Sequence, residues 1–224
     1  MGELPKPRLT SVLRAEGYSY LLYVPEECGG EGSWPLLLFL HGVGERGNEL
    51  EKVAVHGVPK QIEEGVALPF VVVSPQCPAG RFWDNALLIR LLDEVNSSGR
   101  IDADRVYVTG LSMGGYATWS LAGEQPWRFA AAAPVCGGGD PRRVGRLRRV
   151  PVWAFHGAKD PVVPVSASRR MVEALLRCGG DARLTIYPDA GHDCWTETYA
   201  NPELYEWLLA HRRRPLREAP CSGP

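Results

Sequence analysis

The sequence has little net charge and no long apolar run. Its 25 Lys and Arg residues nearly balance its 26 Asp and Glu residues, which leaves a formal net charge of −1. Such a chain as a whole attracts neither nucleic acid nor anionic membrane surfaces. Its longest apolar runs, at 35–40 and 70–73, are much shorter than the ~20 residues that cross a bilayer as a helix. We therefore expect no nucleic-acid partner and no membrane partner.

The N-terminus, Met-Gly-Glu-Leu-Pro-Lys-Pro-Arg, also lacks the apolar segment of a signal peptide. Six cysteines are scattered along the chain without a Cys-x-x-Cys pair: Cys28, Cys77, Cys136, Cys178, Cys194 and Cys221. In a chain of this size, this pattern favours reduced thiols in a cytoplasmic protein. A secreted mature form with one or two disulfides stays an alternative.

Segments with strand and helix patterns alternate along nearly the whole chain. Strands are expected at 18–24, 36–40, 70–73, 105–109, 129–135, 150–155 and 183–187, and helices at 84–95, 112–122, 165–177 and 202–212. Continuous apolar runs such as 36–40 are typical of strands that are buried on both faces of a parallel sheet. The alternation predicts an α/β fold with a doubly wound, mostly parallel sheet.

The length and composition predict one domain. The chain has 224 residues, of which 45% are hydrophobic and 23% are charged, and one α/β domain commonly reaches this length. We expect the domain to span 1–214 and the proline-containing segment 215–224 to be a flexible tail. The connection between the strands ending near residue 135 and beginning near residue 150 is short, so no large lid domain is expected there.

The stretch Gly110-Leu-Ser112-Met-Gly114 contains the strongest catalytic motif, G-x-S-x-G. It lies between an expected strand and an expected helix, and this context gives the motif its value. A nucleophilic serine must sit on a tight, strained turn, where a Cβ at either flanking glycine would collide with neighbouring backbone. The start of the helix behind Ser112 also favours negative charge that develops there. Ser112 is therefore the candidate nucleophile.

A serine nucleophile needs a base, and the base needs an acid to orient it. In this fold the order along the chain is Ser, then Asp or Glu, then His. His192 follows the strand expected at 183–187 and is the candidate base, and Asp160 follows the strand expected at 150–155 and is the candidate acid. Weaker alternatives for the acid are Asp140, Asp189 and Asp193.

The loop His41-Gly-Val43-Gly-Glu-Arg-Gly follows the strand expected at 36–40 and can form an oxyanion hole. The backbone N–H groups of Val43 and Met113 are the expected donors, with Gly44 as the alternative to Val43. His41 is expected to brace this loop. Trp83 and Trp195 are candidates for a substrate pocket, with core packing as the alternative for each.

Two further features have ordinary explanations. The arginine cluster at 142–149 is interpreted as a solvated surface turn, because the remaining sequence is not basic. His192 and Cys194 could ligate a metal, but two ligands without a second cluster do not make a zinc site. We therefore expect no metal and no cofactor.

Five segments in order carry a family resemblance. They are Leu-Phe-Leu-His-Gly-Val-Gly-Glu-Arg-Gly47, Ser-Pro-Gln-Cys-Pro78 with Trp83 soon after, Asp-Arg-Val-Tyr-Val-Thr-Gly-Leu-Ser-Met-Gly-Gly-Tyr116, His-Gly-Ala-Lys-Asp-Pro161 and Gly-His-Asp-Cys-Trp195. Together they resemble the small single-domain α/β-hydrolases of the phospholipase/carboxylesterase-like, or "predicted peptidase", family. This family is similar to feruloyl esterases and polyhydroxybutyrate-depolymerase-type esterases. The resemblance implies the α/β-hydrolase fold and the triad of Ser112, Asp160 and His192.

The sequence thus favours a serine carboxylic-ester hydrolase that acts on short to medium acyl or aryl esters through an acyl-enzyme. A feruloyl-type esterase or a peptidase is the alternative within the enzymes. A catalytically inactive hydrolase-fold binding module is the alternative of another class. The expected partner is a small-molecule ester, and the chain is expected to be a monomer or a homodimer.

Overall fold

The computed structural model describes residues 7–26, 32–97 and 99–213. These residues form an eight-stranded sheet in the order β1-β2-β4-β3-β5-β6-β7-β8. The strands are β1 (Leu9–Val12), β2 (Tyr20–Tyr23), β3 (Trp34–Leu40), β4 (Val71–Pro75), β5 (Ile101–Leu111), β6 (Ala131–Val135), β7 (Val152–Gly157) and β8 (Ala182–Tyr187). β1 and β2 pair antiparallel at one edge, and the strands from β4 to β8 run parallel. The mostly parallel α/β-hydrolase sheet predicted from the sequence is thereby confirmed.

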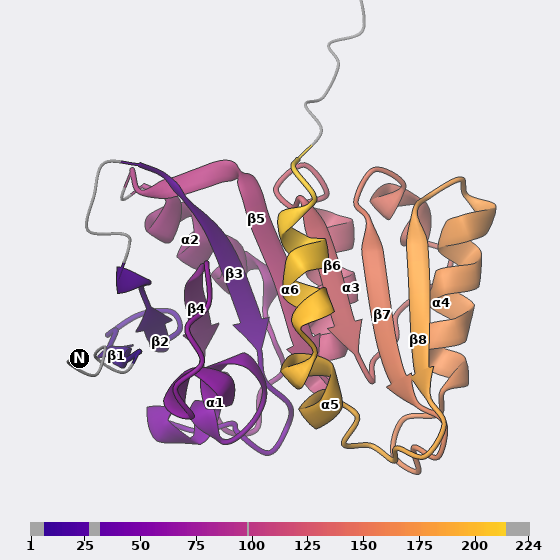
Figure 1. Ribbon diagram of the computed structural model, residues 1–224, viewed down its shortest axis with the longest axis horizontal. Helices are drawn as coiled ribbons and strands as arrows, with labels where there is room; N and C mark the ends of the chain where they lie inside the picture. The colour runs from indigo at the N-terminus through magenta and orange to yellow at the C-terminus, as the bar shows by residue number, and fades with distance from the viewer. Residues whose placement is uncertain (1–6, 27–31, 98, 214–224) are drawn as a thin grey trace, which may run out of the picture.

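Helices cover both faces of this sheet (Figure 1). α1 (Gly57–Glu63), α5 (Trp195–Ala200) and α6 (Pro202–Leu209) pack on one face, and α2 (Asn85–Asn96), α3 (Met113–Glu124) and α4 (Ser166–Arg177) pack on the other. Two short 3-10 helices, η2 (Leu50–Val55) and η3 (Val144–Leu147), complete the elements. η3 is the only helix between β6 and β7, where no lid domain was expected.

The two faces explain why the central strands are apolar throughout. In β3, Leu36, Leu38 and Leu40 pack toward α2, α3 and α4, whereas Leu37 and Phe39 pack toward α1, α5 and α6. Successive side chains of a strand point to opposite faces, so a strand covered on both sides needs apolar residues at every position. All five of these side chains are fully buried.

Several boundaries differ from the sequence predictions. β5 begins at Ile101 rather than at residue 105, because Trp34 of β3 pairs with Ile101 across an irregularity in the register. α6 ends at Leu209 rather than at residue 212. β1, η2, α1, η3 and α5 were not predicted. The tail predicted at 215–224 lies outside the described residues, as do Cys28 and Cys221.

Within the described residues, Cys77, Cys136, Cys178 and Cys194 are free thiols. In that same part of the chain no helix has the length and apolar character needed to cross a membrane.

Candidate active site

Ser112 occupies the sharp turn between β5 and α3. Its backbone has φ 52° and ψ −113°, a conformation that residues other than glycine rarely adopt. The strain is held in place by hydrogen bonds on both sides of the residue. The Ser112 N–H donates to the Val135 carbonyl at 3.0 Å, and the Ser112 carbonyl accepts from the Tyr116 N–H at 3.0 Å. The turn is therefore fixed between β6 and the first turn of α3.

The glycines of the motif are required by space. A Cβ at Gly110 would lie 2.6 Å from the carbonyl oxygens of both Gly114 and Leu40. A Cβ at Gly114 would overlap the Leu40 carbonyl group. Strand β3 and helix α3 thus approach each other too closely for any side chain at these positions, as the motif predicted.

Three side chains from separate loops form one hydrogen-bonded series. The Ser112 Oγ lies 2.9 Å from Nε2 of His192, and Nδ1 of His192 lies 2.7 Å from Oδ2 of Asp160. Ser112 follows β5, Asp160 follows β7 and His192 follows β8. Parallel strands bring these loops to the same edge of the sheet, where sites of open α/β sheets form. The side chain of Asp160 is fully buried, and that of His192 is 19% exposed.

Several donors hold the Asp160 carboxylate. Its Oδ1 accepts from the N–H groups of Val162 at 2.8 Å and Val163 at 2.9 Å, which leaves Oδ2 for His192. Burial opposes ionisation of the carboxyl group, but the hydrogen bonds from His192, Val163 and Val162 outweigh burial and lower the pKa of Asp160. Asp160 is therefore ionised at neutral pH and presents an anionic oxygen to Nδ1 of His192.

The other candidate acids are engaged elsewhere. Asp140 pairs with Arg142 at 2.9 Å, and Asp189 pairs with Lys159 at 2.7 Å. Asp193 accepts from the N–H and the hydroxyl of Thr196 at the start of α5. The structure brings only Asp160 of these four to the histidine among the hydrogen bonds of the described residues.

His156 was missed by the sequence analysis. Its buried imidazole has Nε2 at 2.9 Å from the Val163 carbonyl and 3.3 Å from Oδ2 of Asp160, and its Nδ1 lies 2.7 Å from the Ser168 hydroxyl. Both neighbours of Nε2 are acceptors, so Nε2 carries the proton and faces the carboxylate as a donor. The spacing of four residues between His156 and Asp160, at the end of a strand, was the signal that could have revealed this contact.

Cys136 is a second residue that the sequence analysis left unassigned. It has a positive φ of 41°, is fully buried, and its Sγ accepts from the Ser112 N–H at 3.3 Å. Burial raises the pKa of the Cys136 thiol, so the group stays protonated. Its role is to support the turn beneath the serine.

The loop after β3 is braced by His41, which is fully buried. Nε2 of His41 accepts from the Cys77 N–H at 2.9 Å, so Nδ1 carries the proton and donates to the Gly42 carbonyl at 2.6 Å. The carbonyl and N–H of a trans peptide point in opposite directions, so the Val43 N–H points away from His41. Burial lowers the pKa of His41 to about 4, which keeps this tautomer neutral.

A pocket of about 580 Å³ opens beside Ser112. Its lining is mostly apolar, and Phe82 is 74% exposed, Val43 50% and Tyr116 42%. The lining residues are Val43, Phe82, Trp83, Asn85, Ser112, Met113, Tyr116, Ala117 and Ser120. Pockets of this size and character hold small organic molecules. Val43 and Met113, the expected oxyanion donors, therefore border the same space as the serine.

The two tryptophans differ in position. Trp83 lines the pocket, and its indole N–H donates to the His41 carbonyl at 3.2 Å. Trp195 does not line the pocket. Its ring centroid lies 5.3 Å from that of His192 and 5.4 Å from that of His56. In the described residues, no group of three or more His, Cys, Asp or Glu side chains could hold a metal ion.

Known proteins resemble this chain over most of its length. Residues 83–203, which are 121 of the 224, match the sequence profile of the dienelactone hydrolase family. The crystal structure of a thermostable esterase superposes with a TM-score of 0.80, is 33% identical, and the match covers 93% of this chain and 64% of that chain.

Two relatives are matched by sequence. The bifunctional acetylxylan esterase/xylanase XynS20E of Neocallimastix patriciarum is 32% identical over 189 residues, covering 77% of this chain and 26% of that protein. NocK of Nocardia uniformis subsp. tsuyamanensis, named as an inferred esterase, is 30% identical over 209 residues, covering 75% of this chain and 60% of that protein. The chain thus spans less than two thirds of the length of these proteins.

Proposed function

The chain belongs to the dienelactone hydrolase family, and on this premise we propose that it hydrolyses carboxylic esters through an acyl-enzyme on Ser112. The resemblance to α/β-hydrolases related to esterases, expected from five sequence segments, is confirmed by the matches. The observation that carries the proposal is the hydrogen-bonded series from Ser112 Oγ through His192 to Asp160.

Each member of the series has a defined task. Ser112 Oγ attacks the acyl carbon while Nε2 of His192 accepts its proton, and the same proton then passes to the departing alcohol. Water repeats the sequence on the acyl-enzyme and releases the acid. Asp160 holds the imidazole in the tautomer with Nε2 free and stabilises the imidazolium that forms.

The tetrahedral intermediates carry an oxyanion. We assign the N–H groups of Val43 and Met113 as its donors, each contributing about 3 kcal/mol to the transition state. Support comes from the His41–Gly42 hydrogen bond, which turns the next peptide N–H away from the histidine. Support also comes from the position of both residues around the pocket that contains Ser112.

The substrates are short to medium acyl esters or aryl esters. The pocket beside Ser112 is apolar and open, so it suits an acyl group that enters from solvent. Phe82, Trp83 and Tyr116 give it an aromatic lining that favours a flat acyl group such as a cinnamoyl-type acid. This lining is the observation in favour of the feruloyl-type alternative.

The proposal is tested by the rate of p-nitrophenyl butyrate hydrolysis. Ser112→Ala is expected to lower kcat by at least about 10³-fold, because it removes the group that forms the acyl-enzyme. Ser120→Ala is the matched control, because Ser120 lies on the helix that follows Ser112 and lines the same pocket; its kcat should stay within a few-fold of the parent value. An unchanged rate of p-nitrophenyl butyrate hydrolysis in Ser112→Ala would contradict the proposal.

The rival functions separate in two further measurements. Comparing kcat/KM for methyl ferulate, methyl butyrate and a peptide amide distinguishes a feruloyl-type esterase, an alkyl esterase and a peptidase. Covalent labelling by a fluorophosphonate probe, lost in Ser112→Ala, distinguishes an enzyme from an inactive binding module. A folded protein that takes up no label would favour the binding module.

A further inference from the structure

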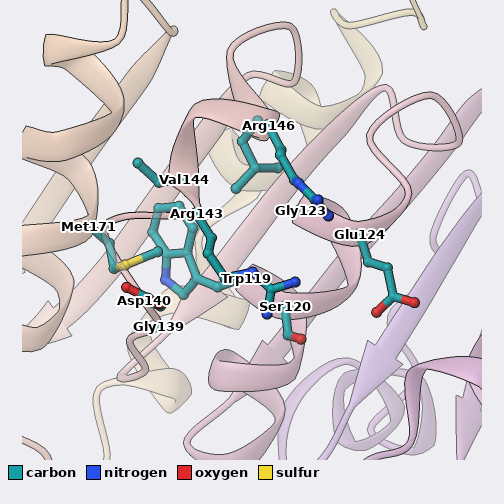
Figure 2. A pocket seen from close by; sticks show the side chains of 11 residues that line it. Trp119, Ser120, Gly123, Glu124, Gly139, Asp140, Arg143, Val144, Arg146 and Met171 are labelled. Atoms are coloured by element: carbon teal, nitrogen blue, oxygen red, sulfur yellow. The ribbon is translucent and has the colours of Figure 1, made fainter.

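A second recess lies along α3, the helix that begins directly after Ser112. It has a volume of about 130 Å³, several times the space that one water requires, and lies between α3, the segment from Gly139 to Leu147, and α4 (Figure 2). Trp119 of α3 lines it, and Met171 of α4 and Leu147 of η3 add apolar walls. This recess therefore has room for a small organic molecule.

Trp119 brings an unpaired donor to this recess. The residue is 3% exposed, and its Nε1 is buried without a hydrogen-bond partner among the described residues. Buried N–H groups in folded proteins nearly always have an acceptor. An acceptor on a bound molecule would complete the hydrogen bonding of the indole.

Two arginines at the recess are also unpaired. The side chains of Arg143 and Arg146 line it, both residues are exposed, and neither has a carboxylate within 4.0 Å in the part of the chain that the structure describes. In Figure 2 the Arg143 side chain extends past Trp119 toward Ser120, and the Arg146 side chain extends toward Gly123. The unused hydrogen-bonding capacity here consists of donors, two of them cationic.

The acidic groups of the recess are already engaged. Asp140 accepts from Nε of Arg142 at 2.9 Å and from its Nη2 at 3.0 Å. Glu124 accepts from Nδ2 of Asn85 at 2.7 Å. Neither carboxylate forms an ion pair with Arg143 or Arg146 within 4.0 Å among the described residues, although the charge of Arg143 contributes, after the bonds from Arg142, to lowering the pKa of Asp140. The two carboxylates also repel a dianion such as phosphate more than a monoanion.

From this pattern we infer that the recess binds a small carboxylic acid in its carboxylate form. The carboxylate oxygens accept from the guanidinium groups of Arg143 and Arg146 and from the indole N–H of Trp119. The hydrocarbon part packs against Leu147 and Met171. A carboxylate fits both the unpaired donors and the apolar walls, whereas a neutral molecule leaves the two cations without a partner.

The recess is linked to the pocket beside Ser112. Ser120 lines both, and Asn85 donates to the Ser120 hydroxyl at 2.9 Å as well as to Glu124. A ligand in the recess thus touches the same stretch of α3 as an acyl group in the pocket. The acid that ester hydrolysis would release is one source of the ligand, and this source alone rests on the proposed function; an unrelated cellular acid is the other.

The test uses the full chain carrying Ser112→Ala, with ¹⁵N-labelled tryptophan, and sodium benzoate as the probe. We expect benzoate to shift the indole resonance that Trp119→Phe removes, in a saturable manner. Replacing both arginines (R143Q and R146Q) should weaken binding at least five-fold. Replacing Arg148 and Arg149 in the same way is the matched control, because it removes the same charge from exposed residues that do not line the recess.

Further arms decide the ligand class and its source. Benzyl alcohol should give no saturable shift, and inorganic phosphate should bind more weakly than benzoate. Binding should persist when Ser112 of the parent protein is blocked by a fluorophosphonate.

Four outcomes would each overturn the inference. They are the absence of a saturable Trp119 shift, equal weakening of binding by both double replacements, tighter binding of phosphate than of benzoate, and loss of binding when Ser112 is blocked. Because the resonance is read in Ser112→Ala, the result does not depend on esterase activity. Tighter binding of the acids released from the best ester substrates than of unrelated acids would identify the product as the source.

Discussion

At the scale of single residues, the role of Asp160 depends on charge and orientation together. Its carboxylate is fully buried and accepts from two backbone N–H groups, from His192, and at longer range from His156. Asn at this position keeps the shape but presents an amide that can fix the wrong tautomer of the base. In the proposed mechanism Asp160 therefore acts through the imidazole rather than on the substrate.

We predict that Asp160→Asn lowers kcat for p-nitrophenyl butyrate by about 10³- to 10⁴-fold while the protein remains folded. The measurement is steady-state kinetics together with circular dichroism. Asp189→Asn is the control, since the Asp189 side chain is 90% exposed and pairs with Lys159, and it should change kcat by less than two-fold. An equal loss in the two variants would contradict the assignment of Asp160 as the acid.

His41 makes a second prediction, on stability against pH. Burial lowers its pKa from 6.5 to about 4 in the folded protein. As the pH falls from 6.5 towards 4, His41 becomes protonated in the unfolded chain but stays neutral in the folded protein. The free energy of unfolding therefore decreases over this pH range and levels off below it. This residue alone should lower the free energy of unfolding by about 2 kcal/mol at pH 5 relative to pH 8.

Urea unfolding of the parent and of His41→Gln between pH 5 and pH 8 checks this expectation. The variant loses the Cys77 and Gly42 hydrogen bonds in their present form, so its stability is lower at every pH. The relevant quantity is therefore the slope of the free energy of unfolding against pH, and this slope should be smaller in His41→Gln than in the parent. Equal slopes would show that His41 does not carry the pH dependence.

At the scale of elements, the junction of β3, β5 and α3 decides whether the serine turn can form. We predict that Gly114→Ala lowers the free energy of unfolding by about 2–3 kcal/mol, because its Cβ would overlap Leu40 and lie 2.8 Å from the His41 carbonyl oxygen. Gly123→Ala on the same helix is the matched control. Its Cβ would meet only Leu147 Cγ, at 4.0 Å, and it should raise stability by about 0.5–1 kcal/mol through helix propensity. Thermal and urea unfolding measure both, and destabilisation of similar size in the two variants would contradict the steric argument.

The elements that the sequence did not predict share a physical reason. β1 reads Leu-Thr-Ser-Val and is an edge strand whose central residues are exposed, so it has no apolar run. α1 and α5 have seven and six residues, which is too short for a helical period to stand out. The buried strands and the longer helices were predictable because β3 and α4 each show a sustained pattern over seven and twelve residues.

At the scale of the whole molecule, the parallel strands bring loops that are far apart in the sequence to the same edge of the sheet. Ser112, Asp160 and His192 could be selected from sequence because each follows a segment that was predicted as a strand. For His156 the sequence held only a weak signal, its spacing of four residues from Asp160 at the end of a strand. For Cys136 it held none, because the position of the thiol beneath Ser112 depends on a positive φ that no sequence pattern records. The recess at Trp119 was equally unpredictable, since it joins side chains of α3, η3 and α4 across distant parts of the chain.

The openness of the pocket leads to the last prediction, on lipid-like substrates. Enzymes with lids expose their site only after a segment moves, and an oil surface can drive that movement. Here Phe82, Val43 and Tyr116 already border Ser112 with 74%, 50% and 42% of their surface exposed, and β6 and β7 are joined with only η3 between them. The rate on tributyrin should therefore rise hyperbolically and pass its solubility limit without a jump. A pH-stat assay across that limit measures this, with the water-soluble p-nitrophenyl acetate as the reference for active protein. An abrupt increase at the limit would mean that a part of the chain covers the pocket in solution and withdraws at the interface.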